Sequence, residues 1–282
     1  MFVRTIEPSN SEKSEFDHIR KTPILGGQFF VTNDTLTIGI MTKYWEVGRV
    51  KTRLGSSIGL MRSAALHELF VTYLYNSLGH VQGRRTICLA PDSRVADFES
   101  VLSSNEMDKT WDVLPQGDGT LGERMQRWFV RCLKMDSSKA ILIGADCPTL
   151  SADVVAKADQ ALDNHDLVLG PAVDGGYYLI GLRGSWDQRG ESFEQLFRDI
   201  PWSTDLVMSE TRGRAEAAGL SVAEIDTMED VDTEAELDRL MIQLDADPNH
   251  AKLRSSIDVI LNDPSLDSAS TDSLSNRTRP SQ

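Results

Sequence analysis

Short apolar runs alternate along the chain with segments whose apolar residues recur every three or four positions. The clearest run is Ile141–Ile143, which is apolar throughout, as in strands buried on both faces of a parallel sheet. It ends at Gly144, and Pro148 cannot continue a ladder of strand hydrogen bonds. Beyond Ser151 the apolar residues return at helical spacing. The pattern therefore predicts a buried strand followed by a helix with Ser151 as its N-cap.

The same alternation repeats from residue 35 to residue 244. Further strands are predicted at residues 35–41, 85–90, 110–114, 166–170 and 220–225. Helices are predicted at residues 60–78, 95–102, 121–133, 205–218 (capped by Pro201–Thr204) and 234–244. Residues 175–182 are expected to run back as an extended segment. Strands that alternate with helices indicate an α/β fold of Rossmann-like type, with a mainly parallel central sheet and helices on both faces.

Three regions follow from this pattern. Residues 1–34 are polar, apart from a possible edge strand at 28–31, and are interpreted as an N-terminal extension. Residues 35–244 form the predicted domain. Residues 245–282 form a C-terminal tail in which Leu253–Leu261 could make one small amphipathic helix. The tail after residue 265 has little to bury, so we expect it to be largely disordered.

Charge and cysteine content narrow the class of partner. The chain has 29 Lys and Arg against 43 Asp and Glu, a net charge of −14, which disfavours nucleic acid or an anionic membrane as partner. The three cysteines have no metal-ligand spacing and fit reduced thiols of a cytoplasmic protein. No apolar run approaches membrane-spanning length, and the start of the chain lacks the apolar core of a signal peptide.

Four loops emerge where predicted strands end: Thr42–Arg53, Gln116–Glu123, Asp146–Thr149 and Asp230–Thr233. Because parallel strands point the same way, these loops are expected to share one edge of the sheet, where open α/β sheets bind ligands. The candidate chemistry therefore gathers at this edge.

The first loop is basic. It places Arg49, Lys51 and Arg53 next to Gly48, and such a loop can meet phosphate oxygens with its cations and its backbone N–H groups. It lacks the order of glycines, Lys and Ser/Thr of a P-loop. The alternative is a solvated basic loop, but in so acidic a chain we favour phosphate binding.

The other loops supply acids: Asp118, Glu123, Asp146, Asp174, Asp230 and Asp232. Mg²⁺ typically takes one or two carboxylates plus water and substrate phosphate, so one Asp from the central strand and one from the last loop would suffice. Each acid taken alone fits a cap, a turn or a solvated charge equally well. For Asp146 the alternative is a cap on the helix that follows.

A series of linked motifs resembles the DUF2064 family. The motifs start at Gly48, Gln116, Ile143, Gly170, Pro201 and Asp230, and they occur in the same order between about residues 35 and 240. Members are assigned as nucleotide-diphospho-sugar transferases of GT-A fold, some of the arsenosugar-biosynthesis type. The family is similar, more distantly, to molybdenum-cofactor and phospholactate nucleotidylyltransferases. Trp45 and Val47 stand where the family usually has prolines. This difference predicts a less rigid loop or another nucleotide preference.

The resemblance implies a GT-A fold, a nucleotide held by the first loop, and Mg²⁺ or Mn²⁺ held by Asp146 with Asp232. On this basis the expected nucleotide-binding residues are Gly48, Arg49, Lys51, Thr52, Arg53, Gly119 and Glu123. The expected catalytic residues are Lys51, Arg53 and Asp174.

Asp232 is preferred to Asp230 as the second metal ligand. Alternation turns Val231 into the domain and the two acids towards the edge of the sheet. Thr233 and Glu236 can form a capping box, which leaves Asp232 free.

Asp174 precedes Gly175 and Gly176, which let backbone approach a ligand closely. Asp174 could therefore meet a sugar or acceptor hydroxyl. The alternative is a turn that requires positive φ.

Three functions remain open. The first is a glycosyltransferase that moves a sugar from a nucleotide sugar to a small-molecule acceptor. The second is a nucleotidylyltransferase that transfers NMP from an NTP and releases pyrophosphate. The third is a non-catalytic nucleotide-binding module.

Overall fold

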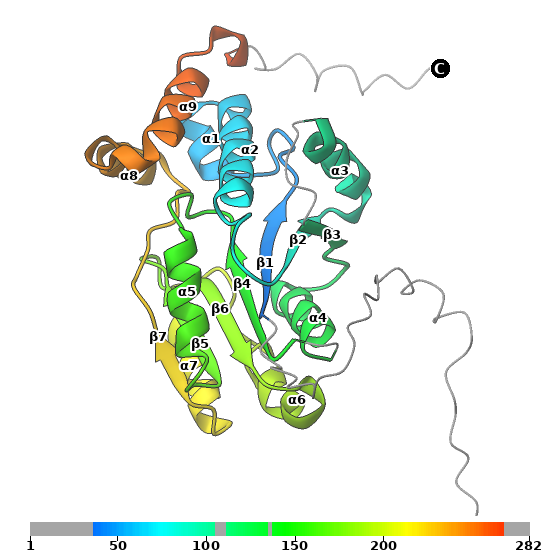
Figure 1. Cartoon of the computed structure of the whole chain (residues 1–282). Helices are drawn as coiled ribbons and strands as arrows, with labels where there is room; N and C mark the ends of the chain where they lie inside the picture. The colour runs from blue at the N-terminus through cyan, green and yellow to red at the C-terminus, as the bar shows by residue number, and fades with distance from the viewer. Residues whose placement is uncertain (1–35, 105–110, 135–136, 268–282) are drawn as a thin grey trace, which may run out of the picture. The chain divides into compact units, whose positions relative to one another are not determined.

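The computed structural model describes residues 36–104, 111–134 and 137–267. The predicted N-terminal extension with its edge strand, and the predicted disorder beyond residue 267, lie outside the described residues. In this part of the chain a seven-stranded sheet is covered by helices (Figure 1). The order of the strands is β3-β2-β1-β4-β6-β5-β7. The strands are β1 (Leu36–Lys43), β2 (Arg84–Ala90), β3 (Trp111–Pro115), β4 (Lys139–Gly144), β5 (Leu167–Pro171), β6 (Tyr177–Arg183) and β7 (Val222–Glu224).

The sheet is mostly parallel, as predicted. β1 pairs in parallel with both β2 and β4, and β2 pairs in parallel with β3. β6 runs antiparallel between β4 and β5, which confirms the segment expected to run back. In register, Met41 of β1 lies between Cys88 of β2 and Gly144 of β4. The carboxyl ends of these strands therefore meet at one edge, and their loops leave the sheet together.

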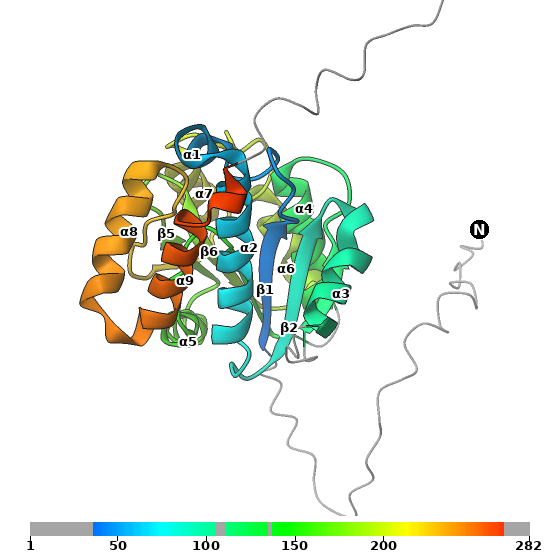
Figure 2. The same ribbon diagram turned by 90° about the horizontal axis from the view of Figure 1, so that it is seen from above.

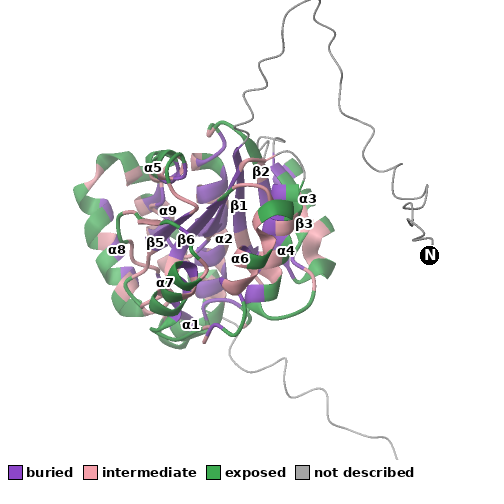
Figure 3. Cartoon of the chain, turned by 90° about the horizontal axis from the view of Figure 1, so that it is seen from below, coloured by how far each residue is buried: buried purple, intermediate pink, exposed green. Residues whose placement is uncertain are grey.

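Helices cover both faces of the sheet, as Figure 3 shows by the buried strands between partly exposed helices. One face packs against α2 (Leu60–Ser77), α3 (Val95–Ser104) and α5 (Ala152–Ala161). The other packs against α4 (Leu121–Lys134), α6 (Trp186–Gln195) and α7 (Val207–Ala217). Nonpolar burial of this kind is the main term that stabilises such a fold. No helix in the described part of the chain is long and apolar enough to cross a membrane.

A third cluster of buried apolar side chains lies on the side of α2 away from the sheet. Besides α2 itself, the helices α1 (Thr52–Ile58), α8 (Glu234–Ala246) and α9 (Ala251–Leu261) contribute to it. Figure 2 shows α8 and α9 side by side next to α2. α9 confirms the small amphipathic helix predicted in the tail. Its Leu253 and Ile257 are fully buried in the same cluster as Phe70 of α2. Short 3₁₀ helices occupy Asp92–Arg94, Pro248–His250 and Pro264–Leu266.

Of the two helices after β6, one was missed and the other was predicted with too early a start. α6 was not predicted, because its buried Trp186 and Phe193 stand seven positions apart in an otherwise polar stretch. α7 begins at Val207 rather than directly after Thr204. The Thr204 hydroxyl accepts from the Leu206 N–H at 3.3 Å, and residues 205–206 form a turn ahead of the helix. Such a bond from a side chain to the nearby backbone competes with helical hydrogen bonds.

Candidate active site

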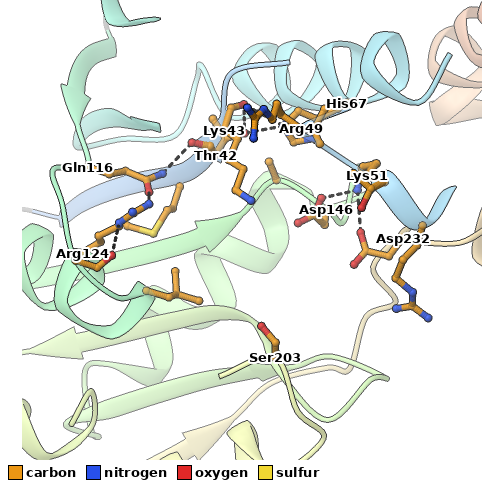
Figure 4. Close-up of a pocket in the computed structure, with 17 residues that line it drawn as sticks. Thr42, Lys43, Arg49, Lys51, His67, Gln116, Arg124, Asp146, Ser203 and Asp232 are labelled. Atoms are coloured by element: carbon orange, nitrogen blue, oxygen red, sulfur yellow. Dashed lines mark hydrogen bonds and ion pairs between the residues drawn. The ribbon is translucent and has the colours of Figure 1, made fainter. Parts of the chain in front are cut away.

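The four loops predicted to share one edge of the sheet line a single cavity of about 540 Å³ (Figure 4). Its volume lies in the usual range for small-molecule sites. Its lining includes Arg49–Arg53 of the first loop, Gly119 of the second, Asp146 after β4 and Asp232 of the last. Residues far apart in sequence therefore meet at the position that the alternation of strands and helices predicts.

Lys51 is the residue that joins three of these loops. It precedes α1 in a left-handed conformation, with φ 42° and ψ 47°. Its ammonium forms an ion pair with Asp146, donates to the carbonyl oxygen of Val231 at 2.8 Å, and lies 3.4 Å from Oδ1 of Asp232. The Lys51 side chain is 2% exposed, whereas those of Asp146 and Asp232 are 47% and 40% exposed. The ammonium is buried, and the carboxylates still face the cavity.

The last loop is fixed by hydrogen bonds at both of its ends. The backbone N–H of Val231 donates to the carbonyl oxygen of Asp146 at 3.0 Å, and the Val231 side chain is buried as predicted. The predicted capping box of Thr233 and Glu236 is present. Oε2 of Glu236 accepts from the N–H groups of Thr233 at 2.7 Å and of Asp232 at 2.6 Å. Asp232 is thus oriented through its backbone, and its carboxylate is not used as a cap.

The electrostatics of this cluster follow from burial and from the ion pairs. Burial alone would lower the pKa of Lys51, but Asp146 and Asp232 outweigh it, so the Lys51 pKa is raised. Burial opposes the ionisation of Asp146, yet the Lys51 ammonium lowers its pKa overall. For Asp232 burial prevails, and the pKa is raised. In the described residues no backbone N–H donates to the Asp146 carboxylate, so Asp146 does not cap the helix that follows.

The lining of the cavity contains several cations. Besides Lys51 they are Lys43, Arg49, Arg53 and Arg124. Within the described ranges, no carboxylate forms a salt bridge with any of these four. Cations in a cavity without protein counter-charges suit a polyanionic ligand.

The first loop is anchored where the family usually has prolines. Trp45 stacks on Tyr44, with ring centroids 4.6 Å apart, and lies 5.4 Å from the ring of Phe98. Gly48 follows at a φ of 75°, which favours glycine, in a turn where the Arg49 N–H donates to the Glu46 carbonyl oxygen at 2.9 Å. Aromatic packing thus holds the start of the loop, for which the sequence predicted either lower rigidity or another nucleotide preference. The second alternative stays a prediction.

Two of the expected nucleotide-binding residues do not line the cavity. Gly48 shapes the turn before it. Glu123 lies in the first turn of α4, where its Oε2 accepts from the N–H of Thr120 at 2.7 Å and from its hydroxyl at 3.1 Å. These bonds make Glu123 a cap of α4. A contact between Glu123 and a nucleotide stays a prediction, as it does for the residues that line the cavity.

Asp174 lies in a smaller cavity of about 120 Å³ with Asp230 and Cys147, and Asp146 lines both cavities. Oδ1 of Asp174 accepts from the Gly176 N–H at 2.9 Å. Gly175 has a φ of 90°, and a Cβ there would lie 2.3 Å from the carbonyl oxygen of Asp205. The turn therefore requires glycine, as one of the two interpretations proposed.

Two side chains of this smaller cavity, Asp230 and Cys147, have raised pKa values. Burial, reinforced by Asp174 and Asp232, raises the pKa of Asp230 to about 6. The Cys147 thiol is buried and its pKa is raised well above the usual range, so it is no nucleophile.

Several residues that line the larger cavity were not selected from sequence: Lys43, His67, Gln116, Arg124 and Ser203. Gln116 and Arg124 belong to a motif of the family that the sequence resembles, and the structure links them by a hydrogen bond. The Gln116 amide nitrogen donates to the carbonyl oxygens of Thr42 and Cys88, at 2.8 and 2.9 Å, and Arg124 donates to the Gln116 amide oxygen at 3.4 Å. Gln116 thereby joins the ends of three strands.

His67 carried no signal in the sequence, because it lies on the apolar face of a helix. Its Nε2 lies 3.0 Å from the Lys43 carbonyl oxygen and 3.2 Å from the Thr42 hydroxyl. Burial lowers its pKa to about 4, so the imidazole is neutral near pH 7. It supports the backbone at the end of β1, next to the cavity.

The exposed carboxylates of Asp146 and Asp232 fit a Mg²⁺ or Mn²⁺ ion, which needs only one or two protein carboxylates. In the part of the chain that the structure describes, no group of three or more His, Cys, Asp or Glu side chains converges on a point. Such an ion would therefore take its other ligands from water and phosphate. The Lys51 ammonium already holds one oxygen of Asp146 and lies near one of Asp232.

Comparison with known proteins confirms the resemblance to DUF2064. The family model described as "Uncharacterized protein conserved in bacteria (DUF2064)" matches residues 74–204. No curated protein matches the sequence. A solved structure from Desulfovibrio desulfuricans G20, provisionally named a nucleotide-diphospho-sugar transferase, is 28% identical, with a TM-score of 0.71. The match covers 81% of this chain and 97% of that one. The fold of this chain is thus similar to that of a protein provisionally named a nucleotide-diphospho-sugar transferase.

More distant structures share the arrangement only loosely. The 4-diphosphocytidyl-2C-methyl-D-erythritol synthase of Anaerococcus prevotii DSM 20548 is 12% identical, with a TM-score of 0.49 over 76% of this chain and 97% of that one. A CMP:2-keto-3-deoxy-manno-octonic acid synthetase in complex with CTP is 13% identical, with a TM-score of 0.45 over 74% and 99%. Similarity this low says nothing about the site residues or the reaction of this protein.

Proposed function

We propose that the protein is a divalent-metal-dependent glycosyltransferase that moves a sugar from a nucleotide-activated donor to a small-molecule acceptor. One observation carries this proposal. In a single cavity, cations without protein counter-charges face two exposed carboxylates that already share a cation. A nucleoside diphosphate and its metal ion need both of these features. The match to the D. desulfuricans protein supports the same class of donor.

In this proposal Arg49 and Arg53 bind the diphosphate of the donor, together with Lys43 from the end of β1. Their side chains line the cavity, and charge-assisted hydrogen bonds to phosphate are strong. The backbone of Thr52 and Gly119 borders the same space and can approach the nucleotide. These cations also stabilise the negative charge that grows on the diphosphate as the bond to the sugar breaks.

Asp146 and Asp232 would hold Mg²⁺ or Mn²⁺. The ion would supply positive charge that makes the nucleoside diphosphate a better leaving group. Lys51 keeps the two carboxylates together at the inner side of the cavity. A contact between Lys51 and phosphate, which the sequence predicts, requires its ammonium to leave Asp146.

We assign the acceptor to the smaller cavity, because Asp146 lines both cavities and so brings the acceptor next to the donor phosphates. Asp174 is exposed there and can accept a hydrogen bond from an acceptor hydroxyl, which orients its oxygen for attack on the sugar. Asp230, which shares this cavity, has a raised pKa and is suited to take up a proton near pH 6. The buried, free cysteines are consistent with a reaction in the cytoplasm.

One observation favours a second candidate, nucleotidyl transfer from an NTP. Four cations besides Lys51 line the cavity, and a triphosphate uses more of them than a diphosphate does. An acceptor hydroxyl or phosphate would then attack the α-phosphate, and pyrophosphate would leave.

A panel of NTPs and nucleotide sugars, incubated with Mg²⁺ and a mixture of small hydroxylated acceptors, separates the candidates. Release of a nucleoside diphosphate from a nucleotide sugar supports glycosyl transfer. Release of pyrophosphate from an NTP supports nucleotidyl transfer. Tight nucleotide binding without either product would indicate a non-catalytic module.

A further inference from the structure

The buried ammonium of Lys51 stands where a metal ion shared by Asp146 and Asp232 would be expected. It contacts Oδ1 of both carboxylates, while the rest of each carboxylate faces the cavity (Figure 4). Its third acceptor is the carbonyl oxygen of Val231, at 2.8 Å. A lysine with three acceptors on two separate loops acts as an internal counter-cation.

The left-handed backbone of Lys51 indicates that the contacts of its side chain hold the residue in place. A non-glycine residue in the left-handed region persists only where its surroundings fix it. Here the contacts of the ammonium, together with the ring of Phe70 at 5.6 Å, are what fix it. If these contacts were exchanged, the side chain could turn towards the cavity that it already lines.

We propose that Lys51 is an exchangeable internal cation, which competes with a divalent metal ion for Asp146 and Asp232. When a metal–nucleotide complex enters, Lys51 yields the carboxylates and its ammonium moves to the phosphate oxygens. This inference rests on the two-carboxylate metal site of the proposed function. It adds that Lys51 contacts the carboxylates before the metal ion binds and the phosphates afterwards. It also explains how one lysine can be buried among carboxylates and still serve the phosphates, as the sequence predicts.

Charge balance is the physical basis of the competition. Two ionised carboxylates and one ammonium leave a net charge of about −1, whereas the carboxylates alone present about −2 to an incoming cation. Removal of the lysine charge should therefore strengthen the binding of a divalent ion in the absence of nucleotide. If Lys51 only organised the site, its removal would weaken that binding instead. The two roles predict opposite signs.

The chain offers a matched control in Lys139. This lysine opens β4, the strand that ends just before Asp146, and its side chain is 5% exposed. Its ammonium pairs with Asp159 at 3.0 Å and with Asp163 at 2.6 Å. Lys139 therefore has the same burial and the same two-carboxylate environment, but it does not line the cavity.

The experiment measures Mn²⁺ binding by electron paramagnetic resonance, without nucleotide, for the wild type, Lys51→Gln and Lys139→Gln. Glutamine can still donate to Val231 and so preserves the loop. We expect Lys51→Gln to bind Mn²⁺ about tenfold more tightly than the wild type, and Lys139→Gln to match the wild type. In parallel, acetylation of the wild type is followed by mass spectrometry. Lys51 should react slowly in the metal-free protein and faster with saturating Mn²⁺, while Lys139 stays slow in both.

Equal or weaker Mn²⁺ binding by Lys51→Gln would overturn the proposal, as would Lys51 reactivity that does not respond to Mn²⁺. If Lys51→Gln fails to fold, the reactivity of the wild type decides alone. Absence of Mn²⁺ binding in every protein at millimolar concentrations would overturn the metal site and this inference together. Competition for Mn²⁺ in a protein that transfers no sugar would overturn the proposed function and leave this inference standing.

Discussion

The Nζ atom of Lys51 and Oδ1 of Asp232 lie 3.4 Å apart, although 181 positions separate the two residues. This contact joins the loop after the first strand to the loop before α8. The Asp146 ion pair adds the end of the central strand to the same point. Charge pairs therefore hold the candidate site together around Lys51, while the other cations of the cavity form no salt bridge with a described carboxylate.

The Asp146 carboxylate should be required for metal-dependent nucleotide binding. Asp146→Asn keeps the shape of the side chain and an oxygen that can accept from Lys51, so the fold should persist. We expect a loss of about 2 kcal/mol or more of Mg²⁺-dependent nucleotide affinity in isothermal titration calorimetry. Asp159→Asn, which alters the equivalent pair at Lys139, is the control. An Asp146→Asn protein with the metal dependence of the wild type would exclude Asp146 as a ligand.

Arg49 and Arg53 should each contribute to nucleotide affinity. Substitution of either by alanine is expected to cost about 1.5–3 kcal/mol, the range for hydrogen bonds to a charged group. Both effects should shrink as salt concentration rises. Arg212→Ala, in an exposed residue of α7 paired with Glu224, controls for the loss of one positive charge. If all three variants bind nucleotide alike, the first loop is an ordinary solvated surface.

Asp230 should make stability depend on pH. Its pKa is about 6 in the folded protein, against an ordinary value of 3.8, so the folded state binds the proton more tightly. Stability from this group is present at low pH and is lost as pH rises from about 4 to about 6. Asp230→Asn should therefore raise the free energy of unfolding by about 1 kcal/mol near pH 8. This figure is discounted because solvent screens a half-buried carboxyl.

Urea denaturation of Asp230→Asn and the wild type near pH 8 and near pH 4 measures this effect. The gain should shrink strongly near pH 4, where Asp230 is protonated in the folded state and partly protonated in the unfolded state. Asp238→Asn, in an exposed residue of α8, should show no comparable gain at either pH. A gain for Asp230→Asn that is the same at both pH values would show that burial of its charge is not the cause.

The same substitution at two glycines should have opposite effects on stability. A Cβ at Gly39 of β1 would lie 2.5 Å from the Trp128 ring, whose Nε1 donates to the Thr86 hydroxyl at 2.9 Å. Gly39→Ala should therefore lower the free energy of unfolding by about 1–3 kcal/mol. At Gly213 in α7 such a Cβ would meet no atom within 4 Å beyond its chain neighbours and the backbone of its own helix, so Gly213→Ala should add about 0.5–1 kcal/mol. Thermal denaturation compares the two, and a stable Gly39→Ala would show that Trp128 can move aside.

The sequence predicted those parts of the fold that follow from local periodicity. The central strand, the helices around Leu66 and Trp128, and the shared edge of the loops are all present in the structure. Polar α6 was missed because only tertiary burial of Trp186 and Phe193 decides its place. The late start of α7 was missed because a turn with a bond to the Thr204 hydroxyl precedes the helix.

The candidate site was only partly predictable for a related reason. The residue types and loops could be read from strand ends, since parallel strands must bring them together. The environment of Lys51 could not, because burial of one ammonium depends on three segments whose contacts no local pattern encodes. The same is true of His67, which enters the cavity lining from the apolar face of a helix.

The identity of the released product tests the central claim most directly. The wild type and Asp146→Asn are incubated with nucleotide sugars, or with NTPs, in the presence of Mg²⁺ and small hydroxylated acceptors, and the products are resolved by ion-exchange chromatography. The account predicts a nucleoside diphosphate from at least one nucleotide sugar, in amounts that require Mg²⁺ and fall sharply in Asp146→Asn. Pyrophosphate from an NTP, or no product from either class of donor, would contradict it.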